Sequence, residues 1–159
     1  MKQTDYSQIA PSYEKNLFRL NVPPDNDLLD FIYRSPCSSF QVLDLACGTG
    51  IYLRKQINFF KHVDIAWHGL DASEDMLNIA KEKIADASLL KGLAECLPYE
   101  SASFDFIVSN YAFHHFVKKQ EVLNEITRTL KQHGVCKIHN ISIQDMPKWW
   151  VFQLFSLCL

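Results

Sequence analysis

The chain has 159 residues, of which 48% are hydrophobic, and this is enough for one globular domain with its own core over residues 1–159. The formal net charge is −2 and no basic stripe is interleaved with aromatic residues, so the sequence gives no support for binding nucleic acid. The five cysteines are widely spaced and form no Cys-x-x-Cys pair, which favours reduced thiols in a cytoplasmic protein and no metal site. The N-terminus is polar and lacks the apolar core of a signal peptide. No apolar run is long enough to predict a membrane span.

The first part of the chain, residues 1–35, is predicted to be a helical segment that precedes the core. Residues 21–27 (NVPPDND) indicate a loop by their proline and asparagine content, and a short helix is expected over residues 28–33. From residue 40 onward, strand and helix patterns alternate. This alternation is typical of βαβ units and a parallel sheet.

Residues 42–50 (VLDLACGTG) predict a short apolar strand that ends in a Gly-x-Gly turn and leads directly into a helix. Small residues at Ala46, Gly48 and Gly50 let the backbone approach a ligand closely and adopt φ angles that a side chain disfavours. In an open α/β sheet, such a turn at the carboxyl end of the first strand binds a nucleotide-like cofactor. A tight strand–helix connection without a ligand is the alternative.

Two residues of this region distinguish between cofactors. Leu53 stands where the dinucleotide fingerprint has a third small residue. Asp44 places a negative charge at the turn, which would repel a phosphate but suits an ammonium or sulfonium group. The region resembles motif I of class I S-adenosylmethionine-dependent methyltransferases, in particular the small-molecule branch that includes the ubiquinone and menaquinone methyltransferases. The resemblance implies that the methionine end of the cofactor is held by Asp44, Ala46, Cys47, Gly48 and Gly50.

A second strand is predicted over residues 65–70 (IAWHGL), and Asp71 falls at its end. An acidic residue there can accept hydrogen bonds from both ribose hydroxyls, so Asp71, with Ala72 after it, is assigned to cofactor binding. Ser73 is the expected N-cap of the helix that follows. The apolar positions of that helix recur at helical spacing at Met76, Leu77, Ala80 and Ile84. A plain helix-capping role for Asp71 is the alternative.

Residues 93–99 (LAECLPY), followed by residues 103–110, resemble the family's adenine-side loop and fourth strand. Relatives commonly have aspartate where this chain has Leu93, so backbone groups around Ala94, or Glu95, are expected to meet the adenine instead. As alternatives, Leu93 forms a hydrophobic wall against the adenine ring, and Glu95 is a solvated charge of the loop. By the same resemblance, Asn110 and its neighbours face the transferred methyl group.

A pair of histidines, His114 and His115, follows the fourth strand. They are expected to shape the floor of the site and to hydrogen-bond to the backbone, because adjacent residues point in different directions and no acidic or thiol partner lies at metal-ligand spacing. A general-base role for either is the alternative. A helix is predicted over residues 121–131, and residues 130–135 (LKQHGV) resemble the family's turn into strand five.

The resemblance extends toward both ends of the chain. Residues 6–13 resemble the segment that folds over the cofactor in these enzymes, with Tyr13 facing the cofactor, and the cofactor-binding core spans residues 40–143. The family's sheet has seven strands, and the aromatic tail at residues 145–159 leaves no room for the last two. This indicates either a truncated protein or an open edge strand, and it predicts self-association through the tail.

The predicted fold is α/β, a Rossmann-like doubly wound parallel sheet of the class I methyltransferase type that lacks the usual last two strands. The resemblance implies methyl transfer from S-adenosylmethionine to a small-molecule acceptor. A protein that binds the cofactor without catalysis and an NAD-dependent oxidoreductase are the alternatives. Positioning of donor and acceptor with exclusion of water requires no dedicated nucleophile, so no catalytic side chain is assigned.

Overall fold

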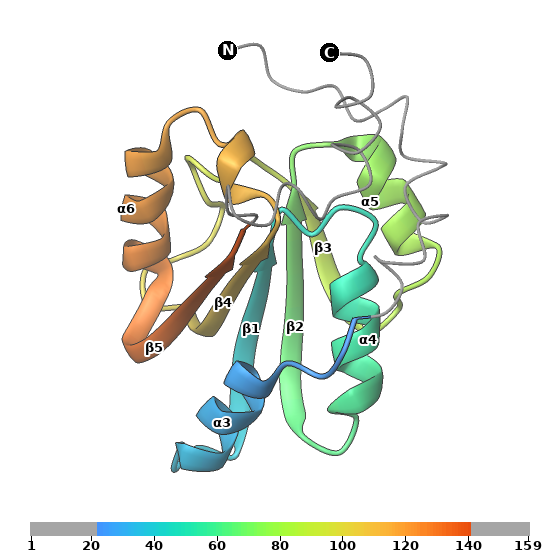
Figure 1. Cartoon of the computed structure of the whole chain (residues 1–159), viewed down its shortest axis with the longest axis vertical. Helices are drawn as coiled ribbons and strands as arrows, with labels where there is room; N and C mark the ends of the chain where they lie inside the picture. Colours follow the sequence, from blue (N-terminus) through green and yellow to red (C-terminus); the bar gives the residue numbers. More distant parts are fainter. Residues whose placement is uncertain (1–21, 141–159) are drawn as a thin grey trace, which may run out of the picture.

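The computed structural model describes residues 22–140, in which a five-stranded sheet lies between two layers of helices (Figure 1). All neighbouring strands pair in parallel, in the order β3-β2-β1-β4-β5. The strands are β1 (Ser39–Leu45), β2 (Asp64–Asp71), β3 (Ala87–Lys91), β4 (Phe104–Asn110) and β5 (Leu130–His139). The helices are α3 (Asn26–Arg34), α4 (Ile51–Phe59), α5 (Glu74–Lys81), the 3-10 helix η1 (Phe113–His115) and α6 (Lys119–Thr129). The predicted doubly wound parallel sheet is confirmed.

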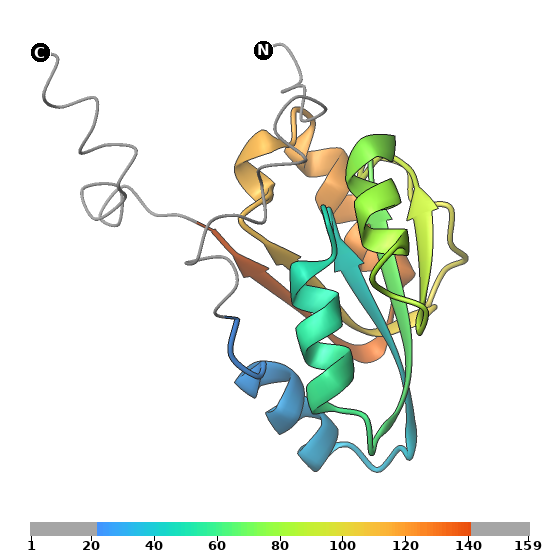
Figure 2. The ribbon, with the colours of Figure 1, turned by 90° about the vertical axis from the view of Figure 1, so that its right-hand side faces the viewer.

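The central strand β1 contributes to two separate cores, because successive residues of a strand face opposite sides of the sheet. On one face, Val42 lies in a cluster with buried residues of α3, α4 and α5. On the other face, Leu43 and Leu45 lie in a cluster with Val122 and Ile126 of α6. Figure 2 shows the layers that contain α4 and α6 on opposite sides of the sheet. With helices on both faces, the carboxyl ends of the strands remain as the edge where side chains from different strands meet.

Short polar side chains begin two of the helices. The Asp25 carboxylate accepts hydrogen bonds from the backbone N–H groups of Asp27 and Leu28, which explains why α3 begins two residues before its predicted start. Ser73 caps α5 as predicted, since its hydroxyl accepts from Met76 N at 3.4 Å. Each cap satisfies a backbone donor that the first turn of a helix leaves without an intrahelical partner.

Two elements differ from the sequence-based expectation. Strand β3, at the edge of the sheet, is not predicted. The helix predicted over residues 121–131 ends at Thr129, and Leu130 already belongs to β5. Leu130 pairs with Phe104 of β4, and this pairing outweighs the helical spacing of Leu130 from Ile126.

Some predictions concern residues that the structure does not describe. Residues 1–21 of the predicted N-terminal helical segment (residues 1–35) lie outside the described residues, and Tyr13 is among them. The tail at residues 145–159, with its predicted self-association, lies outside them too. Within residues 22–140, no helix has the length and apolar character that crossing a membrane requires.

Candidate cofactor site

The turn after β1 contains three residues with positive φ. Ala46 (φ 62°), Gly48 (φ 56°) and Gly50 (φ 73°) lie in the left-handed region, which glycine adopts without steric cost and other residues rarely adopt. The N–H groups of Ala46 and Cys47 donate to the Leu70 carbonyl at 2.7 and 3.1 Å, so the turn is attached to the end of β2. The special φ angles predicted for this turn are confirmed, and one of them occurs at a residue with a side chain.

The two glycines of the turn serve different purposes. A Cβ atom on Gly50 would overlap Ile84 Cδ1 and lie 3.3 Å from Ala80 Cβ, so the lack of a side chain there allows the residues at the end of α5 to pack against the turn. A Cβ atom on Gly48 would meet nothing within 4 Å. The open side of the turn is therefore at Gly48, where the sequence predicts a ligand.

Alanine substitutions at the two glycines are expected to differ in cost. Gly48→Ala should lower the free energy of unfolding by about 1–2 kcal/mol through backbone strain alone. Gly50→Ala should lose about 1–3 kcal/mol more, because its Cβ displaces Ile84 in a packed core. Urea denaturation of both variants beside the wild type measures the difference. Equal losses would mean that Ile84 moves aside without cost and that packing does not require a glycine at position 50.

Asp71, at the carboxyl end of β2, holds the turns around it with both carboxylate oxygens. Oδ2 accepts from Gly48 N at 2.7 Å and Oδ1 from Ser73 N at 2.9 Å, while Ala72 between them is exposed. Burial raises the pKa of Asp71 above its usual value, although these backbone hydrogen bonds act to lower it. A carboxylate has about four lone-pair sites, so Asp71 can still accept from a hydroxyl. Ser73 rather than Asp71 caps α5, so the helix-capping alternative for Asp71 is wrong. Asp71 connects the two turns, and its binding of the ribose stays a prediction.

Asp44 is buried one residue before the end of β1, with only 2% of its surface exposed. Its Oδ2 atom has no hydrogen-bond partner in the part of the chain that the structure describes. Burial, together with the charges of Asp71 and Asp25, raises the pKa of Asp44 to about 8. A cationic group beside such a carboxylate would stabilise its charged form. The environment therefore agrees with the predicted ammonium or sulfonium partner.

A second polar cluster connects α3, α4 and β5. Asp25 accepts from Tyr52 OH at 2.7 Å and from Lys137 Nζ at 2.8 Å, and Lys137 also pairs with Asp27 at 2.8 Å. Burial acts to raise the pKa of Asp25, but the hydrogen bonds from Lys137 and Tyr52 outweigh it, and the pKa lies below its usual value. Lys137 is thus paired with two other carboxylates, and Asp44 forms no ion pair with any described residue.

The sequence contains only part of the information needed to find this cluster. The Asp-Asn-Asp pattern before α3 is a recognisable N-cap signal for Asp25. Nothing in the sequence connects Asp25 with Lys137, which lies 112 positions further along the chain.

The loop predicted to lie beside the adenine follows β3. Gly92 N donates to the Asp71 carbonyl at 3.0 Å, which attaches the loop to the predicted ribose residue. Ala94 is buried and Glu95 half-buried, whereas Leu93 is 52% exposed. Leu93 therefore presents an apolar side chain at the position where an aspartate is common among relatives. Contacts of Ala94 and Glu95 with adenine stay predictions.

Buried polar atoms without partners gather at the carboxyl ends of β1 and β4. Of the six such atoms among the described residues, four lie there: Asp44 Oδ2, Thr49 Oγ1, Ser109 Oγ and Asn110 Nδ2. The other two are His68 Nδ1 on β2 and the Tyr99 hydroxyl in the loop after β3. Buried polar atoms in proteins nearly always have a hydrogen-bond partner. Four such atoms, including those of the predicted residues Asp44 and Asn110, indicate that a polar molecule binds at this edge of the sheet.

His114 and His115 lie exposed in η1, with their ring centroids 3.8 Å apart. His114 Nδ1 lies 2.7 Å from Asn140 Oδ1, so the predicted hydrogen bond to the backbone is wrong for His114, whose partner is a side chain. Partial burial and the neighbouring His114 lower the pKa of His115. Among residues 22–140, no group of three or more histidine, cysteine, aspartate or glutamate side chains could hold a metal ion.

Known proteins share this sequence pattern. A family model described as a methyltransferase domain matches residues 42–134, which is more than half of the chain. The ubiquinone/menaquinone biosynthesis C-methyltransferase of Campylobacter jejuni is 31% identical over 139 residues, which cover 82% of this chain and 59% of that protein. The demethylmenaquinone methyltransferase of Thermotoga maritima is 39% identical over 94 residues, 59% of this chain and 40% of that protein. The chain thus spans at most 59% of the length of these two curated relatives.

A solved structure shares the fold. A SAM-dependent methyltransferase from Aquifex aeolicus superposes with a TM-score of 0.65 and 25% identity, over 80% of this chain and 68% of that chain. The family implies S-adenosylmethionine as the cofactor, and the residues present fit it: Asp44 suits the cationic methionine end, Asp71 the ribose hydroxyls, and the turn open at Gly48 a close backbone approach. The chain belongs to the class I S-adenosylmethionine-dependent methyltransferases.

Proposed function

We propose that this chain binds S-adenosylmethionine at the carboxyl ends of β1, β2 and β4 and transfers its methyl group to a small-molecule acceptor. The observation that carries the proposal is the buried Asp44 carboxyl beside the glycine turn, whose Oδ2 atom has no partner within residues 22–140. A cation would supply that partner. The methionine end of the cofactor offers both an ammonium and a sulfonium group.

The residues of this chain contribute positioning rather than covalent chemistry. S-adenosylmethionine, when bound, would supply a methyl group on positively charged sulfur, and an acceptor would bond to the methyl carbon in line while the carbon–sulfur bond breaks and S-adenosylhomocysteine leaves. Asp44 would hold the methionine end, Asp71 the ribose and the loop around Ala94 the adenine, which fixes the cofactor at three points along its length. Asn110, at the end of β4, would border the approach of the acceptor.

S-adenosylhomocysteine is expected to bind this protein and NAD is not. A pyrophosphate would offer no cation to the buried Asp44 carboxyl, and Leu53, fully buried against Gly69 of β2, fills the place where the dinucleotide fingerprint needs a small residue. Isothermal titration calorimetry of one protein sample with S-adenosylmethionine, S-adenosylhomocysteine and NAD measures all three. Binding of NAD without binding of S-adenosylhomocysteine would reject the proposal in favour of an oxidoreductase.

The names of the relatives suggest the class of acceptor. Two of them are a ubiquinone/menaquinone biosynthesis C-methyltransferase and a demethylmenaquinone methyltransferase, so we extend the proposal to a quinone-related acceptor. Transfer of a labelled methyl group to a reduced demethylmenaquinone analogue with a short side chain would support it. Cofactor binding without transfer to such an acceptor would favour the alternative, a protein that keeps the cofactor site without catalysis.

A further inference from the structure

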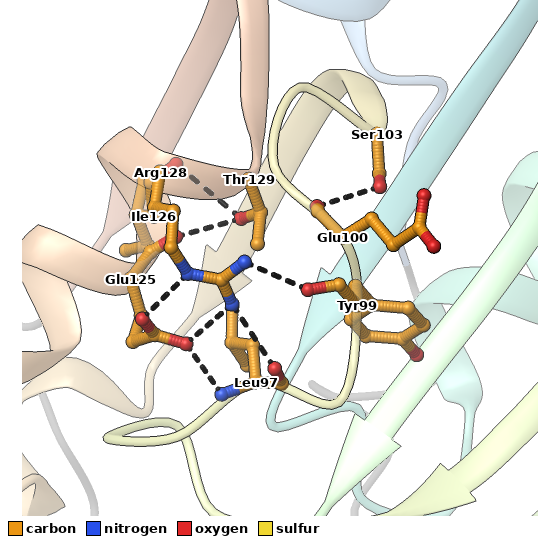
Figure 3. Close-up of polar contacts among 8 residues, drawn as sticks. All are labelled: Leu97, Tyr99, Glu100, Ser103, Glu125, Ile126, Arg128 and Thr129. Atoms are coloured by element: carbon orange, nitrogen blue, oxygen red, sulfur yellow. Dashed lines mark hydrogen bonds and ion pairs between the residues drawn. The ribbon is translucent and has the colours of Figure 1, made fainter.

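Two side chains of α6 hold the far end of the loop that follows β3 (Figure 3). Arg128 donates from Nη1 to the Tyr99 carbonyl at 2.8 Å and from Nη2 to the Leu97 carbonyl at 3.1 Å. Glu125 Oε2 accepts from Leu97 N at 2.7 Å. Both backbone polar groups of Leu97 and the carbonyl of Tyr99 are therefore bonded to the same helix.

Glu125 and Arg128 also hold each other in one geometry. Arg128 Nε and Nη2 donate to Glu125 Oε1 and Oε2 at 2.8 and 2.7 Å, which is a bidentate pair. The hydrogen bond from Arg128 lowers the pKa of Glu125, so the carboxylate is charged at neutral pH. An isolated ion pair on a protein surface contributes little. This pair differs because it also bonds the backbone of a separate segment.

The near end of the same loop is attached to β2, through the hydrogen bond from Gly92 N to the Asp71 carbonyl. Between the two attachments lie Ala94, which is 6% exposed, and Glu95. Ala94 and Leu97 belong to the same core cluster as residues of β1, β2 and α6. The segment with the predicted adenine contacts is thus attached at one end to β2, which carries Asp71, and at the other end to α6.

We propose that Glu125 and Arg128 are positioning residues for S-adenosylmethionine, which hold Ala94 and Glu95 in the conformation that receives the adenine. This inference rests on the proposed function, because the loop matters for binding only if the adenine lies there. Both side chains would act through the backbone of Leu97 and Tyr99, to which they are hydrogen-bonded. A loop that is ordered before binding loses less conformational freedom when the ligand arrives, which raises affinity.

The first turn of the same helix offers a matched control. Lys118 and Glu121 form an ion pair with the same i,i+3 spacing at 3.0 Å, but their side chains are 63% and 50% exposed. Lys118→Gln removes this pair and leaves the contacts of Arg128 with the loop in place. A loss of affinity that follows from removing any ion pair of α6 would therefore appear in Lys118→Gln as well as in a variant of Arg128.

The experiment compares Arg128→Gln, Arg128→Lys and Lys118→Gln with the wild type. Calorimetry measures the affinity for S-adenosylhomocysteine, and hydrogen exchange followed by NMR measures the opening of individual amides. Arg128→Gln is expected to lower the affinity about tenfold and to speed exchange at Leu97 and its neighbours, with exchange in β4 unchanged, since core strands report global unfolding. Arg128→Lys keeps the charge without the planar fork and should show most of the same loss. Lys118→Gln should change neither quantity.

Three results would overturn the positioning role. They are wild-type affinity in Arg128→Gln, loop exchange as slow as in the wild type, and equal acceleration in the loop and in β4, which would mean a general loss of stability. If Arg128→Gln does not fold, the same comparison is made on Arg128→Lys. A wild-type protein that binds no S-adenosylhomocysteine would instead refute the proposed function, and this is distinct from wild-type binding that the substitutions leave unchanged.

Discussion

The Asp44→Asn variant is expected to be more stable than the wild type at pH 7 and above and to bind S-adenosylhomocysteine more weakly. Asparagine has the shape of aspartate but takes no charge. In the wild type, burial and the charges of Asp71 and Asp25 together raise the pKa of Asp44 to about 8. At pH 7 and above, the folded protein must therefore either bury a charged carboxylate or protonate it, and both cost free energy. The substitution removes this cost.

The gain in stability depends on pH in a defined direction. The pKa of Asp44 is about 8 in the folded state, above the ordinary value of 3.8. The protonated group therefore stabilises the fold fully below that ordinary value, and its contribution is lost as the pH rises through about 8. Asp44→Asn lacks this loss, so its advantage grows across the window to on the order of a few kcal/mol. Chemical denaturation from about pH 5 to about pH 9 measures the difference.

Affinity changes in the opposite sense. A hydrogen bond to a charged group contributes about 1.5–3 kcal/mol, so Asp44→Asn should bind S-adenosylhomocysteine about 10- to 100-fold more weakly. In the wild type a bound amine favours the ionised carboxylate, so binding below a pH of about 8 releases a proton from Asp44 and affinity rises toward that pH. Calorimetry in two buffers of different ionisation enthalpy detects this proton.

Asp64→Asn is the control for these measurements, because Asp64 is exposed at the amino end of β2. It should alter stability by no more than about 0.5 kcal/mol and leave affinity unchanged. Unchanged affinity in Asp44→Asn would remove Asp44 from the cofactor site. Lower stability of Asp44→Asn at alkaline pH would mean that the carboxylate has a stabilising partner in the folded protein.

Replacing Asp71 by alanine is expected to weaken S-adenosylhomocysteine binding by two or more decades, whereas Glu95→Ala should have a much smaller effect. Two hydrogen bonds from ribose hydroxyls to a carboxylate would contribute about 1.5–3 kcal/mol each. Calorimetry on both variants gives the two affinities. Small and equal losses would mean that the ribose lies elsewhere.

Asp71→Ala also removes the acceptors of Gly48 N and Ser73 N, so a second comparison separates the ribose contact from damage to the turn. An S-adenosylhomocysteine analogue without the two ribose hydroxyls should bind the wild type much more weakly than the natural ligand does. The variant itself should not distinguish the two ligands, because their interaction with the carboxylate is already absent. A variant that still prefers the natural ligand by the full wild-type factor would exclude Asp71 as the ribose acceptor.

The parts of the site that are local in sequence are predictable from it. The positive φ angles at residues 46–50 and the position of Asp71 each follow from a strand and the residues directly after it. Strand β3 is harder to predict because an edge strand is covered less completely. Ser88 and Lys91 are exposed there, so the strand lacks the continuous apolar run of β4, which is buried along most of its length.

The contacts that the sequence does not predict connect distant positions. Helical spacing places Glu125 and Arg128 on the polar side of α6, but their partner Leu97 lies 28 and 31 positions earlier. Exposed charges are the common expectation for such residues. Only the arrangement of α6 over the sheet brings this pair to the loop after β3.

The order of strands in the sheet affects how this protein can fold while it is being synthesised. β1 is synthesised first, yet it occupies the centre of the sheet, and its second neighbour, β4, is joined to it across 64 positions by the hydrogen bond between Gln41 and Asp105. The ion pair of Asp25 forms later still, because its partner Lys137 lies in β5, 112 positions further along the chain. A nascent chain that ends before β4 therefore exposes the unpaired backbone N–H and C=O groups along one edge of its central strand. Growing chains of this protein should depend on holding chaperones until β4 and β5 have left the ribosome.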